Sequence, residues 1–86
     1  NMVILYTSKF AREYKKLPAS IQREAEKREA AFRKNPFDPK LHTHKLKGRL
    51  GSFWSFSVTY SYRIIFQFAE NDTVWFHSIG DHAIYR

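Results

Sequence analysis

The sequence contains no cysteine, and this excludes both disulfide bonds and thiolate ligands for a metal. No apolar run approaches the ~20 residues that are needed to cross a bilayer. The first residues lack the basic region, apolar stretch and cleavage site of a secretory signal. We therefore expect a cytoplasmic protein in a reducing compartment, with no membrane partner.

Acidic residues are scarce relative to basic ones. Eight Asp and Glu stand against 15 Lys and Arg, which gives a formal net charge of +7. Such an excess favours a polyanionic partner, such as nucleic acid, an anionic surface or an acidic protein segment. The alternative is that the charge serves only solubility.

Aromatic residues, in contrast, are plentiful: the 86 residues include eight Phe, five Tyr and two Trp. A chain of this length buries only about 60–65% of the surface that its unfolded form exposes, so its core must be dense in large side chains. We expect a single domain over residues 1–86.

Two helices are predicted in the first half of the chain. Val3–Tyr6 is a short β-rich run, and Thr7 and Ser8 after it are candidate N-caps. Apolar residues then recur at helical spacing until Pro18 ends the pattern. A second helix is expected to begin near Pro18 and to end at Asn35. The inner side of the first helix is predicted to carry Phe10, Tyr14 and Leu17. That of the second is predicted to carry Ile21, Ala25, Arg28 and Phe32, with Arg28 at its edge. The mixed charges on the second helix are typical of a solvated face, and we assign them no function.

Three strand-like runs follow a loop that extends to Gly51. They cover Phe53–Thr59, Tyr62–Phe68 and Thr73–Ile79, and the junctions between them are short enough for hairpins. The predicted order is β-α-α-β-β-β. This order indicates an α+β fold, in which two N-terminal helices pack on one face of a mostly antiparallel four-stranded sheet.

The other face of that sheet is expected to look toward solvent or a ligand. Because side chains alternate along a strand, this open face should carry a set of polar and aromatic residues. The set is Ser55, Ser57, Arg63, Gln67, Trp75 and His77. Trp54 alternates with the serines and is assigned to the core.

Two segments are predicted to border the open face. The loop His44–Gly48 (HKLKG) leads into the first of the three strands, and the tail Gly80–Arg86 (GDHAIYR) leaves the last. Hairpin-linked strands are neighbours, so this topology can bring together His44, Arg63, His82 and Tyr85. Arg63 is the strongest single indication, because a charge between apolar residues in a central strand is costly unless it is paired or faces a ligand.

These residue types suit the cleavage of an RNA phosphodiester by its own 2′-hydroxyl. Histidines can serve as base and acid, and Arg63 can hold phosphate oxygens. Lys45 and Lys47 can add positive charge, and Tyr85 can stack on a base or donate a proton. No cofactor is needed.

The ordinary alternatives are that Lys45 and Lys47 form a solvated loop and that His77 packs against Trp75. A metal site at His42 and His44 is disfavoured because neither cysteine nor a clear carboxylate partner accompanies them, and His42 is interpreted as a loop residue.

The chain resembles the RelE/ParE superfamily of bacterial type II toxins over essentially its whole length. The resemblance rests on the element order, the Leu17-Pro18 break, the HKLKG loop, the strand motif YRIIFQF (Tyr62–Phe68) and the ending SIGDHAIYR (Ser78–Arg86). It implies an endoribonuclease that cuts mRNA, typically on the ribosome, and a cognate, often acidic, antitoxin.

The resemblance also implies roles for individual residues. His44 and His82 match catalytic histidines of YafQ-type members, Arg63 matches the phosphate-binding arginine of RelE-type members, and Tyr85 matches a C-terminal aromatic of both. The chain departs from the family at Ser57 and Ser61, where YafQ-type members carry a further His and an Asp. RelE-type members place lysines on the strand that here carries Ser55 and Ser57. Two other functions remain open: a non-catalytic inhibitor of DNA gyrase, like the ParE members, and an inactive nucleic-acid-binding relic.

Overall fold

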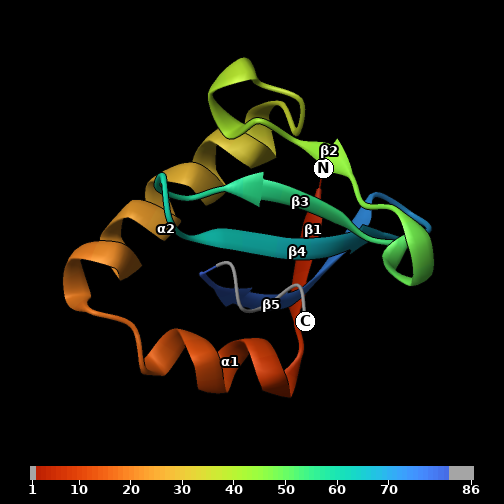
Figure 1. Ribbon diagram of the computed structural model, residues 1–86. Coiled ribbons are helices and arrows are strands. Elements are labelled where there is room, and N and C mark those ends of the chain that lie inside the picture. The colour runs from red at the N-terminus through yellow and green to blue at the C-terminus, as the bar shows by residue number, and fades with distance from the viewer. Residues whose placement is uncertain (1, 82–86) are drawn as a thin grey trace.

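The computed structural model describes residues 2–81 (Figure 1). Within these residues, two α-helices, five strands and two short 3₁₀ helices follow one another. They are β1 (Val3–Tyr6), α1 (Ser8–Lys15), α2 (Ala19–Lys34), η1 (Pro39–Leu41), β2 (His44–Lys45), η2 (Gly48–Leu50), β3 (Trp54–Ser57), β4 (Arg63–Phe68) and β5 (Thr73–Gly80).

The strands form one sheet in the order β1-β5-β4-β3-β2. β1 runs parallel to β5, and the other neighbours are antiparallel. The α+β class is therefore confirmed, but the prediction of four strands is wrong, because β2 is a fifth. Its two residues pair His44 with Ser55 and Lys45 with Trp54. A strand of two residues is too short to produce an alternating pattern, so the sequence gives it no signal.

Local sequence explains where the helices begin and end. The Thr7 side chain accepts a hydrogen bond of 3.0 Å from the Phe10 backbone N–H, which caps α1 as predicted. Pro18 separates the two helices and lies at the start of α2. In Figure 1, α1 runs beneath β5 and α2 rises past the ends of β3 and β4. Within residues 2–81, no helix has the length and apolar character needed to cross a membrane.

The core lies between the helices and one face of the sheet. Phe32 of α2 is at its centre and is completely buried. Its ring centroid lies 4.9 Å from that of Phe56, 4.9 Å from that of Phe66 and 5.6 Å from that of Phe76. Phe10 of α1 joins the same cluster. Of the inner residues that helical spacing predicted, Phe10, Ala25 and Phe32 are buried in this core, and Tyr14, Leu17 and Ile21 are partly buried against it.

The second face of the sheet is not open throughout, which corrects the prediction. Ser55 has an exposed fraction of 0% and Ile65 one of only 5%. Leu50 and Phe53, which come from the segment around η2, line a small pocket together with Ile65, so that segment covers the middle of the face. The expectation that Ser55 is accessible to a ligand is therefore wrong. Alternation predicts which face a side chain takes, but not which loop covers that face.

Candidate functional site

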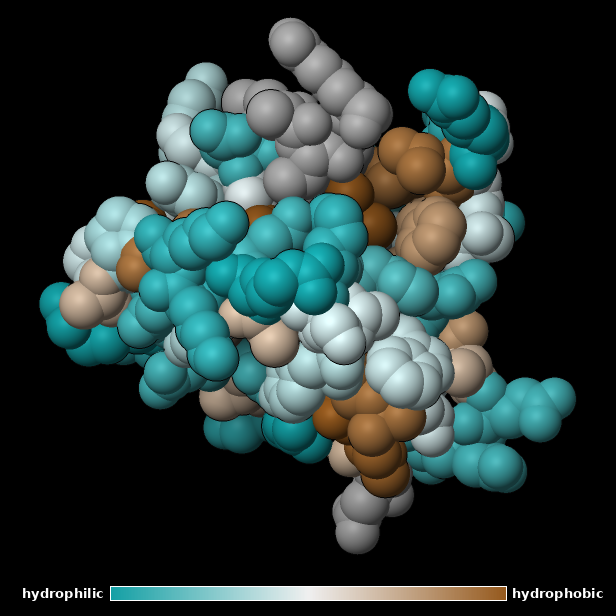
Figure 2. Space-filling view, turned by 90° about the horizontal axis from the view of Figure 1, so that it is seen from below, coloured by the Kyte–Doolittle hydropathy of each residue, from teal (hydrophilic) through white to brown (hydrophobic). Residues whose placement is uncertain are grey.

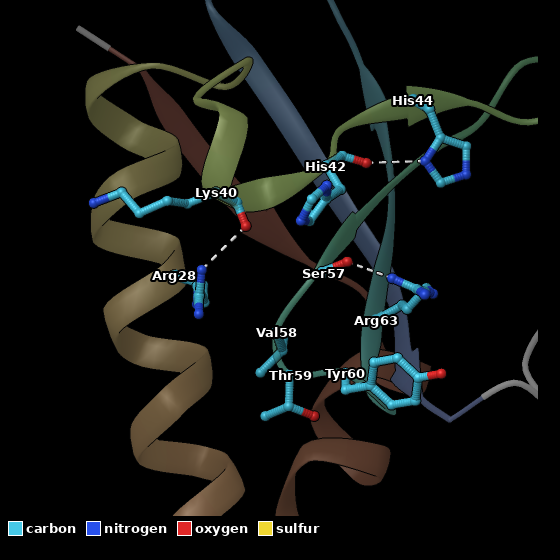
Figure 3. Close-up of a pocket in the computed structure, with 9 residues that line it drawn as sticks. All are labelled: Arg28, Lys40, His42, His44, Ser57, Val58, Thr59, Tyr60 and Arg63. Atoms are coloured by element: carbon cyan, nitrogen blue, oxygen red, sulfur yellow. Dashed lines mark hydrogen bonds between the residues drawn. The ribbon is translucent and has the colours of Figure 1, made fainter.

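A pocket of about 620 Å³ lies where α2, the η1–β2 segment and the β3–β4 hairpin meet (Figure 3). Five of its lining residues carry basic or imidazole side chains and the other four are neutral, so none of these lining residues is acidic. The residues are Arg28, Lys40, His42, His44, Ser57, Val58, Thr59, Tyr60 and Arg63. This composition favours an anionic ligand.

Arg63 is positioned by the strand that precedes it. Ser57 and Arg63 are cross-strand partners at the ends of β3 and β4, and the Arg63 guanidinium donates a hydrogen bond to the Ser57 hydroxyl. Arg63 pairs with Gly80 on its other side. Among residues 2–81, no carboxylate forms an ion pair with Arg63. Its charge is therefore held in place by a neutral acceptor and is presented to the pocket.

His44 has a defined proton position. Its Nδ1 lies 3.0 Å from the His42 carbonyl oxygen. A carbonyl oxygen only accepts hydrogen bonds, so Nδ1 carries the proton in this contact. In the neutral ring, Nε2 then has its lone pair available. The arrangement prepares His44 to take a proton from a ligand.

The segment that carries both histidines is fixed by its own short-range contacts. The Asp38 carboxylate caps η1 by accepting from the Lys40 backbone N–H at 2.9 Å. Leu41 is fully buried and anchors the segment to the core. The backbone then turns at His42, whose φ of 52° lies in the left-handed region. This turn directs the His42 ring toward the pocket (Figure 3), although the sequence analysis interpreted His42 as an ordinary loop residue.

Arg28 is the lining residue that sequence reasoning did not assign to a site. One of its terminal nitrogens donates to the Lys40 carbonyl oxygen at 3.1 Å, while the Lys40 side chain itself points away from the pocket in Figure 3. The sequence does contain an indication that Arg28 is unusual, because it shares the inner side of α2 with Ala25 and Phe32, where a charge is rare. Tyr60, at the hairpin tip, had no signal beyond its aromatic ring.

The structure brings together some of the predicted site residues and separates others. His44, Ser57 and Arg63 line one pocket. Lys45 and Lys47 are exposed beside it and do not line it. Trp75 pairs with Leu5 and Gln67, and it too lies outside the pocket. The remaining predicted residues, His82 and Tyr85, fall outside the described part of the chain.

His77 lies in a separate environment on the second face of the sheet. A β-bulge between Ile65 and Phe66 and the opposite strand lets Ile65 pair with Ser78 and Phe66 pair with Phe76. The His77 ring packs edge-on against Phe53 at 4.8 Å. Burial, and secondarily the charge of Lys9, lower the pKa of His77 below its ordinary value of 6.5.

This shift predicts a pH-dependent contribution to stability. Below about pH 6.5 the unfolded chain binds a proton at His77 that the folded chain resists, so folding becomes less favourable as the pH falls through the folded-state pKa. The stability that is lost in this way is fully present above about pH 6.5, where His77 is neutral in both the folded and the unfolded chain. We expect the His77→Gln variant to lose less unfolding free energy than the wild type between about pH 7.5 and about pH 5, as measured by urea denaturation. Equal losses in the two proteins would contradict this.

Residues 2–81 contain no group of three or more His, Cys, Asp or Glu side chains that could hold a metal ion. The chemistry available in the pocket is that of imidazole, guanidinium and hydroxyl groups. Together they can bind a phosphate and transfer protons near it.

Comparisons with known proteins give matches at the level of structure. Neither the protein-family models nor the curated proteins include a match to this chain. Among solved structures, the YoeB/ParE toxin from Agrobacterium tumefaciens is 16% identical, with a TM-score of 0.79 over 94% of this chain and 99% of that chain. YafQ from Escherichia coli is 15% identical, with a TM-score of 0.80 over 99% and 98%. The toxin–antitoxin complex of DinJ and YafQ, also from E. coli, contains a chain that is 15% identical, with a TM-score of 0.78 over 96% and 94%.

These structural neighbours are toxins of toxin–antitoxin systems, and the likeness extends over nearly the full length of both chains. At such low identities it establishes the fold and not the activity. The fold that the sequence motifs predicted is therefore confirmed: this chain has the fold of the RelE/ParE superfamily of toxins.

Proposed function

We propose that this chain is the toxin of a type II toxin–antitoxin system and that it cleaves mRNA, in association with the ribosome, as a metal-independent endoribonuclease. The observation that supports the proposal is the cationic pocket. In it, Arg63 and His44 line the same space, and no acidic residue is among the described lining. An RNA phosphate is an anion that such a pocket can bind.

His44 is proposed as the general base. Its Nδ1 donates to the His42 carbonyl, so Nε2 of the neutral ring can accept the proton of a ribose 2′-hydroxyl. The 2′-oxygen then forms a bond to the adjacent phosphorus as the bond to the 5′-oxygen breaks. The products are a 2′,3′-cyclic phosphate and a free 5′-hydroxyl. The leaving 5′-oxygen takes its proton from an acid.

Arg63 is proposed to stabilise the charge that builds on the phosphate oxygens. Its bond to Ser57 holds the guanidinium in place before the ligand arrives, so little reorganisation is needed in the transition state. Ser57 is thus a positioning residue. The planar guanidinium can contact two phosphate oxygens at once, which an ammonium group cannot do.

The acid is proposed to be His82, with Tyr85 close to the scissile bond. Both follow β5, whose last residue, Gly80, is the direct partner of Arg63. The chain thus leaves the sheet beside the pocket, which supports this part of the proposal. Lys45 and Lys47, exposed next to the pocket, are proposed to contact the flanking backbone of the RNA.

A cognate acidic antitoxin is proposed as the protein partner. Its support is the net charge of +7 and the neighbour that was solved as a toxin–antitoxin complex. An acidic segment complements the surface of this chain and can compete with RNA for the same basic groups.

The role of His44 predicts a large loss of cleavage in a conservative variant. Because each positioned general base contributes about 10²–10⁴-fold, we expect His44→Gln to lower the rate of RNA cleavage at least about 10²-fold. The measurement is cleavage of a labelled mRNA by purified protein, with and without ribosomes and with EDTA throughout, followed by mapping of the new 5′ ends. The matched control is His77→Gln, which makes the same exchange at a histidine that does not line the pocket.

Three outcomes separate the proposed function from its alternatives. Cleavage that produces 5′-hydroxyl ends, lost in His44→Gln and largely kept in His77→Gln, supports the ribonuclease. Equal cleavage by wild type and a His44→Ala, His82→Ala double variant would defeat the assigned roles. Inhibition of DNA supercoiling by gyrase without any RNA product would favour a ParE-like inhibitor.

A further inference from the structure

Arg28 is held on the opposite side of the pocket from Arg63. Its side chain is 29% exposed, and its Nε lies 3.6 Å from a Glu24 carboxylate oxygen. A terminal nitrogen donates to the Lys40 carbonyl. The bond to Lys40 engages one of the five N–H donors of the guanidinium, and the Glu24 carboxylate lies within ion-pair distance but beyond hydrogen-bond distance. The group is therefore fixed in orientation and still presents donors to the pocket that it lines.

Tyr60 is the most exposed large hydrophobic residue of the described chain, with an exposed fraction of 93%. Its backbone, in contrast, is well fixed. The Thr59 hydroxyl accepts from the backbone N–H groups of Ser61 at 3.2 Å and Tyr62 at 3.1 Å. The hairpin also closes through the Val58 N–H, which donates to the Tyr62 carbonyl at 2.9 Å. A rigid turn thus presents a free aromatic ring that contributes almost nothing to the core.

Figure 3 places these two residues at different ends of the pocket, with Ser57 between them and Arg63 on the Tyr60 side. The pocket, with a volume of about 620 Å³, has room for more than one phosphate group. Proteins bind single-stranded nucleic acid with cations that contact phosphates and with aromatic rings that stack on bases. This pocket offers both, with Arg28 at one end and Arg63 and Tyr60 toward the other.

We propose that Arg28 and Tyr60 form the two ends of a track for single-stranded RNA. Arg28 binds a phosphate next to the scissile phosphate, and Tyr60 stacks on a base at the other end. The proposal rests on the proposed function for the identity of the central phosphate. It assigns to α2 and to the hairpin tip a role in substrate binding that is separate from the chemistry at His44 and Arg63.

Binding to a non-cleavable RNA tests the Arg28 end. A short oligonucleotide with 2′-O-methyl groups cannot be cleaved by 2′-hydroxyl attack, so its affinity is independent of catalysis. For a single strand, each lost phosphate contact lowers the slope of log affinity against log salt by about 0.7. We expect this change in Arg28→Gln. The control is Arg33→Gln on the same helix, because Arg33 pairs with Glu29 at 3.3 Å outside the pocket; its slope should stay closer to that of the wild type.

A single neutral methylphosphonate sharpens the test. Each phosphate that flanks the central one is replaced in turn by a methylphosphonate. At one of these positions the replacement should weaken RNA binding by the wild type, and at that same position it should weaken binding by Arg28→Gln little further. Equal weakening of both proteins at every position would overturn the assignment of Arg28.

The Tyr60 end is tested by two substitutions that differ in stacking. Since stacking of one base on an aromatic ring is worth about 5- to 140-fold in affinity, Tyr60→Leu should lose about that factor. Tyr60→Phe should bind like the wild type because the ring remains. Wild-type affinity in Tyr60→Leu would overturn the assignment of Tyr60.

The track and the proposed function fail in different ways. If the wild type cleaves RNA but Arg28→Gln and Tyr60→Leu bind as the wild type does, the track is wrong and the ribonuclease stands. If the expected binding changes appear without cleavage of an unmodified RNA, the track stands and the ribonuclease is wrong. Absence of RNA binding by the wild type would overturn both.

Discussion

Arg63→Gln is expected to lower the rate of RNA cleavage about 10²- to 10³-fold, which is the typical effect of removing one preorganised donor from a developing anion. Glutamine can still hydrogen bond to Ser57, the partner of Arg63 across the hairpin. The fold should therefore survive while the charge at the phosphate is lost. Single-turnover cleavage of a labelled RNA, with circular dichroism to verify folding, is the measurement.

Two further variants show whether the loss is specific to the guanidinium. Arg63→Lys keeps the charge but not the planar, two-pronged contact, and we expect it to recover only part of the rate. Arg33→Gln removes the same charge from a part of α2 outside the pocket, and we expect little effect. Comparable losses in Arg33→Gln and Arg63→Gln would mean that overall charge, and not this site, controls the reaction.

Phe32→Ala is expected to lower the free energy of unfolding by about 3–5 kcal/mol. Phe32 is fully buried and contacts rings from three strands, so its removal leaves a cavity that neighbouring side chains can fill only in part. A loss of this size is a large part of the total stability of a domain of 86 residues. The melting temperature should fall by at least about 12 °C, measured by calorimetry or circular dichroism.

The control for this variant is Phe37→Ala. Phe37 also contacts aromatic rings, those of Trp54 and Phe68, but its exposed fraction is 54%. Because water already reaches the ring, we expect a loss of only about 1 kcal/mol. Similar losses for the two variants would contradict the position of the core described above.

Much of the fold could be predicted because its signals are local and repeated. The spacing of Phe10 and Tyr14 predicted the first helix, which ends at Lys15, before Leu17, and Thr7 predicted its start. Alternation of Trp54, Phe56 and Val58 with serines specified one face of β3. Such patterns persist because each core residue must take the same side of its element. The family motifs then gave the fold that the solved structures confirm.

The candidate site was less predictable because it depends on contacts between distant segments. Ser55 has the right alternation for an open face, but Leu50 and Phe53 from another segment cover that part of the face. His42 reaches the pocket only because its backbone adopts a left-handed turn. Arg28 reaches it because α2 passes the ends of β3 and β4 (Figure 1). No periodicity within one segment encodes any of these placements.

The exterior of the helix α1 differs from the pocket in its mixture of charges. Figure 2, which views the molecule from the α1 side, shows mainly hydrophilic residues with smaller hydrophobic areas between them. On this helix Lys9 pairs with Glu13 at 2.7 Å, and the Glu13 carboxylate also accepts from the Ile79 backbone N–H at 3.1 Å. Part of the positive charge is therefore neutralised here, whereas the described lining of the pocket contains no acid.

The parallel pairing of β1 with β5 has a consequence for the order of events during synthesis. Val3 of β1 is the partner of Thr73 of β5. β1 therefore cannot form its hydrogen bonds with the sheet until β5 has been synthesised. Contacts of such long sequence separation slow folding and keep the sheet incomplete in a nascent chain. Arg63 likewise gains its neighbour Gly80 only when β5 is made. The sheet around this pocket-lining guanidinium is therefore complete only after residue 80 has been synthesised.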